Sequence, residues 1–151
     1  MKGFLLQLTD VLTIGPNATH TGFVLFVRTA EVLNTFADSE YHSGESVHHL
    51  VENIPNKLGK RTFIDRALMK ADESLFTVEG GDRPVFPSVL VLLTDGRTNP
   101  DSESFSGVIS SLKVRMPIIN FFRKVLIKMH NVIFLTFRIE EKITQEMFLC
   151  Q

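Results

Sequence analysis

Asp95 is the residue whose type and position most strongly indicate a functional site. It directly follows residues 88–94 (SVLVLLT), a short apolar run typical of a strand covered on both faces, and it precedes Gly96. In open α/β sheets, ligands bind beyond the carboxyl ends of the strands, so this position predicts a carboxylate that contacts a ligand. Asp-Gly is also ordinary turn chemistry, and that second interpretation stays open.

Thr62 is the second candidate, because it stands where a turn leads into a helix. The segment 59–68 (GKRTFIDRAL) contains a plausible helix start, and Thr62 followed three residues later by Asp65 gives a capping-box-like pattern. A threonine hydroxyl at this point is therefore explained by helix capping alone. A role as a metal ligand is the alternative, and it depends on the family resemblance given below.

Other reactive side chains give weaker indications. Asn17-Ala18-Thr19 is an N-glycosylation sequon in a Pro-containing loop before a strand, although such short motifs often arise by chance. His48 and His49 are adjacent and would point in different directions on a helix, and no zinc-ligand spacing occurs in the sequence. The sequence also contains no phosphate-binding loop and no nucleophile elbow, so we expect no enzymatic activity.

The elements that would position these residues alternate between strands and helices. Continuous apolar runs at 22–27 and 88–94 predict buried strands, and the half-polar run at 31–36 suits a sheet edge. Helical spacing of apolar residues predicts helices at 4–12, 43–54 (capped by Ser43), 64–75 and 105–112. This alternation predicts one α/β domain over residues 1–151, with a mostly parallel sheet and helices on both faces.

The pattern is less regular beyond about residue 112. Residues 116–120 suit a strand if Pro117 lies at its start or edge, and 132–137 (VIFLTF) suit another. Helical spacing covers 121–129 and 139–147. Basic residues flank the apolar positions of the first of these segments. We interpret it as a domain helix with a basic outer face, with a membrane-facing amphipathic segment as the alternative.

Composition excludes some classes of partner. Sixteen Lys and Arg nearly balance seventeen Asp and Glu, so charge gives no indication of nucleic acid or an anionic membrane as partner. No run approaches the ~20 apolar residues of a transmembrane helix, so we expect no membrane insertion. Gln7 and Asp10 interrupt the apolar start of the chain, which favours a helix over a signal peptide. The single cysteine, Cys150, leaves the redox compartment undetermined.

Residues 14–100 resemble the von Willebrand factor A family. The resemblance is carried by 14–26 (IGPNATHTGFVLF), by the strand around 31–36 (EVLNTF), by GKRTFIDRAL and, most specifically, by 83–98 (RPVFPSVLVLLTDGRT); it weakens beyond about residue 112. It implies a Rossmann-like doubly wound sheet with its binding site at the strand ends, where the strand order reverses.

The resemblance also implies a metal site. Family members commonly hold Mg²⁺ or Mn²⁺ in a metal-ion-dependent adhesion site, with ligands from an Asp-x-Ser-x-Ser motif after the first strand, a later Thr and an Asp after the fourth strand. Thr62 and Asp95 match the last two. The Asp-x-Ser-x-Ser motif is absent, because the helix at 4–12 aligns with the first helix of the family. We therefore expect an incomplete metal site.

The same alignment has a consequence for the sheet. The family's first strand is central, so its absence predicts a partial domain with unpaired backbone on two inner strands. The alternative is a degenerate domain whose sheet closes in a different way. Residues alone leave both interpretations open.

The function implied by the resemblance is that of a non-enzymatic adhesion or protein-binding module. Such modules occur in collagens, matrilins and integrin α-subunits, which implies a secreted or matrix location and a matrix or cell-surface protein as partner. An intracellular scaffold module with the same fold is the alternative. A small nucleotide-using enzyme is a third interpretation, and the lack of a phosphate-binding loop argues against it.

Overall fold

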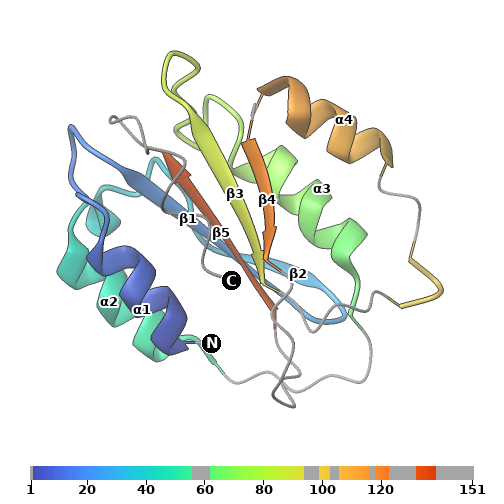
Figure 1. Ribbon diagram of the computed structural model, residues 1–151, viewed down its shortest axis with the longest axis horizontal. Helices are drawn as coiled ribbons and strands as arrows, with labels where there is room; N and C mark the ends of the chain where they lie inside the picture. Colours follow the sequence, from blue (N-terminus) through green and yellow to red (C-terminus); the bar gives the residue numbers. More distant parts are fainter. Residues whose placement is uncertain are drawn as a thin grey trace.

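A central β-sheet with helices on both faces forms the core of the computed structural model (Figure 1). The structure describes residues 2–55, 62–93, 99–102, 106–115, 118–122 and 132–138. In chain order the elements are α1 (Lys2–Asp10), β1 (His20–Phe26), β2 (Ala30–Asn34), the 3-10 turn η1 (Ser39–Tyr41), α2 (Gly44–Asn53), α3 (Ile64–Ser74), β3 (Ser88–Leu93), α4 (Ser106–Arg115), β4 (Ile118–Phe122) and β5 (Val132–Arg138).

The apolar runs of β1 and β3 are explained by two hydrophobic cores, one on each face of the sheet. Every residue of β1 is buried, and successive side chains point to opposite faces. Phe23 and Leu25 pack in the core beneath α1 and α2, whereas Val24 and Phe26 pack in the core beneath α3 and α4. Figure 1 shows the two pairs of helices on opposite sides of the sheet. The predicted α/β layering is therefore confirmed.

The order of the strands is β2-β1-β5-β3-β4. β5 lies in the middle and pairs antiparallel with both neighbours, so that Leu135 is opposite Phe23 on one side and Val91 on the other. β3 and β4 are parallel, and β1 and β2 form an antiparallel hairpin. Strands β1, β3 and β4 thus run in one direction, and β2 and β5 run in the other.

This arrangement corrects two predictions. The sheet is not mostly parallel, because only β3 and β4 form a parallel pair among the described strands. A chain needs a crossover of about a dozen residues or more to begin a second strand in the same direction. β2 follows β1, and β5 follows β4, after fewer residues than that, so β2 and β5 run back in the opposite direction. The inner sides of β1 and β3 are also not left unpaired, since β5 pairs with β1 from His20 to Phe26 and with β3 from Ser88 to Leu93.

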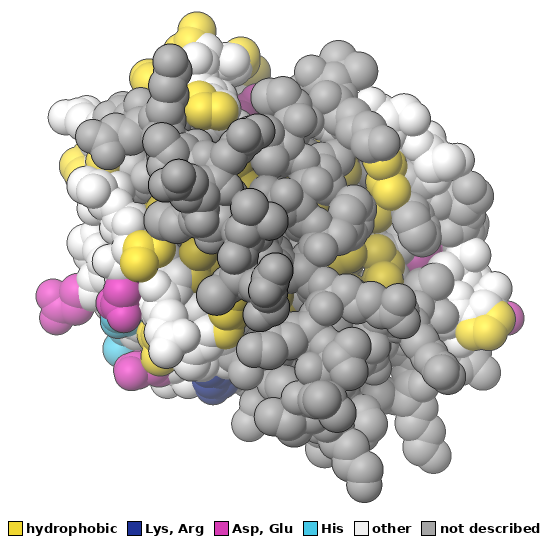
Figure 2. Space-filling model, in the orientation of Figure 1, with side chains coloured by type: hydrophobic (Ala, Val, Ile, Leu, Met, Phe, Trp, Pro, Cys, Tyr) yellow, Lys and Arg dark blue, Asp and Glu magenta, His cyan; other side chains and the backbone are white. Residues whose placement is uncertain are grey.

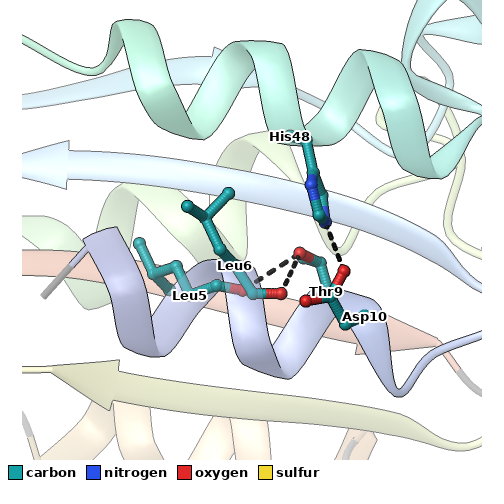
Figure 3. A network of polar contacts seen from close by, with 5 residues as sticks. All are labelled: Leu5, Leu6, Thr9, Asp10 and His48. Carbon is teal, nitrogen blue, oxygen red and sulfur yellow. Dashed lines mark hydrogen bonds and ion pairs between the residues drawn. The ribbon is translucent and has the colours of Figure 1, made fainter.

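Helices α1 and α2 pack side by side on one face (Figure 3). Leu5 of α1 and Val47 and Val51 of α2 are fully buried in the core that they share. The imidazole of His48 contacts the carboxylate of Asp10 at 3.0 Å. This pair is largely exposed, and such pairs contribute only ~0–1 kcal/mol, so the buried side chains hold the helices together.

The helices predicted from capping and periodicity are confirmed, with one exception near the end of the chain. Ser43 caps α2, because its Oγ accepts a hydrogen bond from the backbone N–H of Ser46 at 3.2 Å. Phe121 and Phe122 belong to β4, so their assignment to a helix over 121–129 is wrong at these two positions. A short apolar run suits either element. Residues 123–131 and the helix predicted at 139–147 lie outside the described residues.

Across the described part of the chain, no helix has both the length and the apolar character needed to cross a membrane.

We predict that the backbone amides of β5 exchange with solvent as slowly as those of β1 and β3. A strand paired on both sides opens only when the sheet opens, so its exchange reports the global free energy of unfolding. Amide hydrogen exchange followed by NMR checks this, with the edge strand β2 as the internal control. Rapid exchange at alternate residues of β5 would place it at an edge and contradict the observed strand order.

Candidate functional site

The carboxyl ends of β1, β3 and β4 lie along one edge of the sheet, at the bottom of Figure 1. Two hydrogen bonds join the start of α3 to this edge. The backbone N–H of Phe63 donates to the carbonyl of Val27 at 3.1 Å, and Nη1 of Arg66 donates to the carbonyl of Arg28 at 2.8 Å. These two bonds hold the residue before Phe63, Thr62, beside the end of β1.

Asn99, which follows β3 in the chain, is hydrogen-bonded to the residues before α3. The backbone N–H of Asn99 donates to the carbonyl of Thr62 at 2.7 Å. Asp95 falls between Leu93, the last residue of β3, and Asn99, and is itself outside the described residues. The structure therefore brings Thr62 together with Asn99, the first described residue after β3, at the edge where the sequence predicted a ligand site.

Thr62 is half-buried and stands one residue outside the cap position that the sequence predicted for it. The helix begins at Ile64, with Phe63 in the N-cap position. Phe63 is buried, and its N–H is used by Val27. The helix start is thus fixed by the burial of this aromatic ring and by its backbone bond.

Three residues of this edge were missed by sequence reasoning. Arg28 and Arg66 are exposed, and the guanidinium of Arg66 lies over the Phe63 ring, 4.1 Å from its centre. The side-chain Nδ2 of Asn99 is buried and has no hydrogen-bond partner. The only signal for Asn99 in the sequence is a turn-forming Asn-Pro pair after the strand. No sequence pattern distinguishes Arg28 and Arg66 from other exposed arginines.

The described residues do not fit a complete metal site of the kind found in the family. Among them there is no group of three or more His, Cys, Asp or Glu that could hold a metal ion. The sequence before β5 agrees with this. The first residue of β5, Val132, lies opposite Phe26 at this edge, and residues 123–131 (RKVLIKMHN) precede it in the sequence. That segment contains no Asp, Glu, Ser or Thr, the oxygen donors that Mg²⁺ prefers.

A second polar cluster lies at the opposite edge of the sheet, where β1 begins. His20 is only 7% exposed, and its ring stacks on that of His42 with 3.8 Å between the ring centres. Nε2 of His20 lies 3.1 Å from the carbonyl of Pro16, and Nε2 of His42 lies 2.9 Å from the carbonyl of Phe36. In the neutral tautomer with hydrogen on Nε2, each ring donates to its carbonyl.

The surroundings of His20 favour the uncharged state of its ring. Nδ1 of His20, the atom that would take up a proton, is buried without a hydrogen-bond partner. Burial lowers the pKa of His20 below its ordinary value of 6.5, and the charges of Arg83 and His42 lower it further, against the opposing effect of the bond to Pro16. We interpret the cluster as a structural link between two loops.

Arg83 extends this link. Its Nη2 donates to the carbonyl of Ala18 at 2.8 Å, which joins the loop before β3 to the loop before β1. Its guanidinium lies over the ring of Phe86, with 4.9 Å to the ring centre. The loops at this edge are thus joined by side chains and by the backbone bond from Ala37 to the carbonyl of Gly80, and those at the carboxyl edge by backbone bonds and Arg66.

An α/β sheet with helices on both faces places the chain in the Rossmann-like class of α/β domains. The family model of the von Willebrand factor type A domain matches residues 1–145, and the chain belongs to this family.

Relatives of known sequence and structure agree with this assignment. The chain is 33% identical over 96 residues to von Willebrand factor A domain-containing protein 1 of Mus musculus, covering 64% of this chain and 22% of the mouse protein. It is 28% identical over 98 residues to Matrilin-1 of Homo sapiens, covering 65% of this chain and 19% of the human protein. The chain thus spans about a fifth of the length of these relatives.

A solved structure supports the fold. The structure of proximal thread matrix protein 1 from the mussel byssus superposes with a TM-score of 0.69 at 21% identity, covering 81% of this chain and 30% of that one. The similarity covers more of this chain than either sequence match does.

We predict that acid destabilises the folded chain through His20. Because its pKa is lowered in the folded state, the unfolded chain binds more protons, so the free energy of unfolding falls as the pH drops below about 6.5. Thermal unfolding across pH 5–8 checks this. His20→Phe keeps an aromatic ring on His42 and removes the proton site. We expect it to lower stability near pH 8 by ~1–3 kcal/mol, since the Pro16 carbonyl loses its donor, and to flatten the pH dependence, so that the difference from the parent shrinks in acid.

His49→Asn, which removes an exposed imidazole outside this cluster, is the matched control. A His20→Phe variant with an unchanged pH slope would assign the acid effect to another group.

Proposed function

We propose that this chain is a non-enzymatic adhesion and protein-binding module of an extracellular matrix or cell-surface protein. The observation that carries the proposal is membership of the von Willebrand factor type A family, together with relatives that include Matrilin-1. We place the protein outside the cell, in the matrix or at the cell surface, for the same reason.

The contact surface in this proposal is the carboxyl edge of the sheet. Its backbone is held by the bonds of Val27 to Phe63 and of Thr62 to Asn99, so a partner meets a preformed surface at little entropic cost. Arg28 and Arg66 present exposed guanidinium groups there, and arginine is enriched where proteins bind each other. An acidic side chain of the partner suits these two groups.

We further propose that Thr62 and Asp95 form a partial site for Mg²⁺ or Mn²⁺ at the same edge. A hydroxyl and a carboxylate are suitable ligands, and Mg²⁺ retains several waters in protein sites. Two protein ligands give weak binding, because the cation must keep most of its hydration shell. The open positions would accept a carboxylate from the partner, as the family resemblance implies.

We predict that the chain binds Mg²⁺ or Mn²⁺ only weakly, in the millimolar range or above, and that Asp95→Ala abolishes this binding without changing the fold. Isothermal titration calorimetry, with circular dichroism to monitor the fold, measures both. The matched control is Asp101→Ala, which removes an exposed carboxylate six positions further along the chain and should leave the affinity unchanged. If Asp95→Ala binds as the parent does, the metal assignment is wrong.

We predict that Arg28→Ala lowers the affinity for a matrix ligand about tenfold or more, since it removes an exposed charge from the proposed surface. The probe is a panel of immobilised fibrillar collagen, fibronectin and laminin, measured by surface plasmon resonance. Glu79→Ala alters an exposed charge in the loop before β3, at the opposite edge, and should leave binding within about twofold.

Failure of the parent chain to bind the panel would argue against the matrix proposal. If the tagged gene product also remained inside the cell, the alternative of an intracellular scaffold module would be favoured instead.

A further inference from the structure

We infer that Asn17 carries an N-linked glycan, and that this glycan covers the edge of the sheet opposite the proposed binding surface. The inference rests on the proposed function in one respect, namely that the chain passes through the secretory pathway. Asn17-Ala18-Thr19 is the only sequon in the sequence, so any N-linked sugar on the chain reports on this residue.

The loop between α1 and β1 presents Asn17 to solvent. Ala18 donates its N–H to the carbonyl of Gly15 at 3.0 Å, which closes a turn with Pro16 and Asn17 at its tip. The side chain of Asn17 is exposed. A bulky, hydrophilic substituent can therefore extend from this residue without displacing any described side chain.

The burial of Thr19, the third residue of the sequon, requires that the sugar be added before the loop folds. Thr19 is only 4% exposed, and its backbone exchanges bonds with Thr13 and Gly15 at 3.0 and 3.3 Å. A transferase that recognises this hydroxyl has access to it only before the loop folds. Transfer joins Nδ2 of Asn17 to C1 of the sugar, breaks the bond from C1 to the pyrophosphate of a lipid-linked oligosaccharide, and releases the lipid pyrophosphate and one amide proton.

The loop before β3 presents exposed apolar side chains beside the glycan. Arg83 ties the loop before β3 to the carbonyl of Ala18, so the two loops lie side by side. That loop exposes Val78 and Val85 at 83% and 86%. Figure 2 shows hydrophobic side chains at the top of the molecule, over the segment that leads into β3. Exposed apolar side chains on a soluble domain favour association, and a hydrophilic glycan beside them opposes it.

The position of the glycan leaves the proposed binding surface free. Asn17 precedes the amino end of β1, whereas Thr62 and Arg28 lie at its carboxyl end. β1 runs the full width of the sheet between them (Figure 1). A modified Asn17 is therefore compatible with a partner bound at the carboxyl edge.

The first experiment measures occupancy. The full chain is expressed in mammalian cells behind a cleavable secretion signal, and its intact mass is measured before and after treatment with an endoglycosidase. We expect one glycan on the parent chain and on Thr19→Ser, and none on Asn17→Gln or on Thr19→Val, which keeps the shape of the buried side chain. Purified, folded chain from bacteria should accept no sugar from microsomes. A secreted parent chain with unmodified Asn17 would overturn the inference.

The second experiment tests placement. Val27→Asn creates a sequon with Arg28 and Thr29 at the carboxyl edge, and it is combined with Asn17→Gln so that the glycan moves from one edge to the other. Val27→Gln in the same background is the matched control without a sequon. Binding to the matrix panel should stay within about twofold with a glycan at Asn17 and fall at least tenfold with one at position 27.

The outcomes separate the two proposals. If the glycan at Asn17 itself blocks binding that Asn17→Gln retains, its placement away from the partner is wrong. If Asn17 is occupied and neither form binds any matrix protein, the proposed function fails and the glycan assignment stands.

Discussion

The fold depends on how the inner backbone groups of β1 and β3 find their hydrogen-bond partners. These two strands are buried and run in the same direction, and buried N–H and C=O groups left unpaired would each cost about 1–3 kcal/mol. β5 satisfies both strands at once, pairing along the whole of each. Without it the sheet would be two separate pairs, β2 with β1 and β3 with β4. The hydrophobic cores on both faces span the two pairs and so depend on the same strand.

The direction of β5 also decides what the carboxyl edge can contain. β5 brings its first residue, Val132, to this edge and its last, Arg138, to the opposite edge, so the chain leaves the middle strand away from the carboxyl ends of β1 and β3. What remains at the edge comes from neighbouring connections, namely the turn after β1, the residues before α3 and the return from β3. The backbone bonds from Phe63 to Val27 and from Asn99 to Thr62 join these connections. The exposed Arg28 and Arg66 beside these bonds suit the protein contact that we propose for this edge.

Much of this architecture follows from local sequence patterns. The apolar runs predicted strands β1 and β3, and the serine before an amphipathic stretch predicted helix α2. Helix α3 was predicted from the apolar stripe of Ile64, Ala67, Leu68 and Ala71. The strand at 132–137 was also predicted, but its place and direction were not, because pairing partners far apart in the chain leave no local signature. The stacked pair of His20 and His42 was missed for the same reason, since neither residue stands in a recognisable motif. The grouping of Thr62 with Asn99 arises from a backbone bond that residue types do not encode.

The chain order of the strands has a consequence for synthesis on the ribosome. β1 precedes the strand that completes it by about a hundred residues, so at about 5–20 residues per second roughly 5–20 s pass before the sheet can close. During that time the nascent chain holds an apolar strand with one open side, a template for pairing with other polypeptides. Until translation has passed β5, the open side of β1 therefore remains available for such pairing.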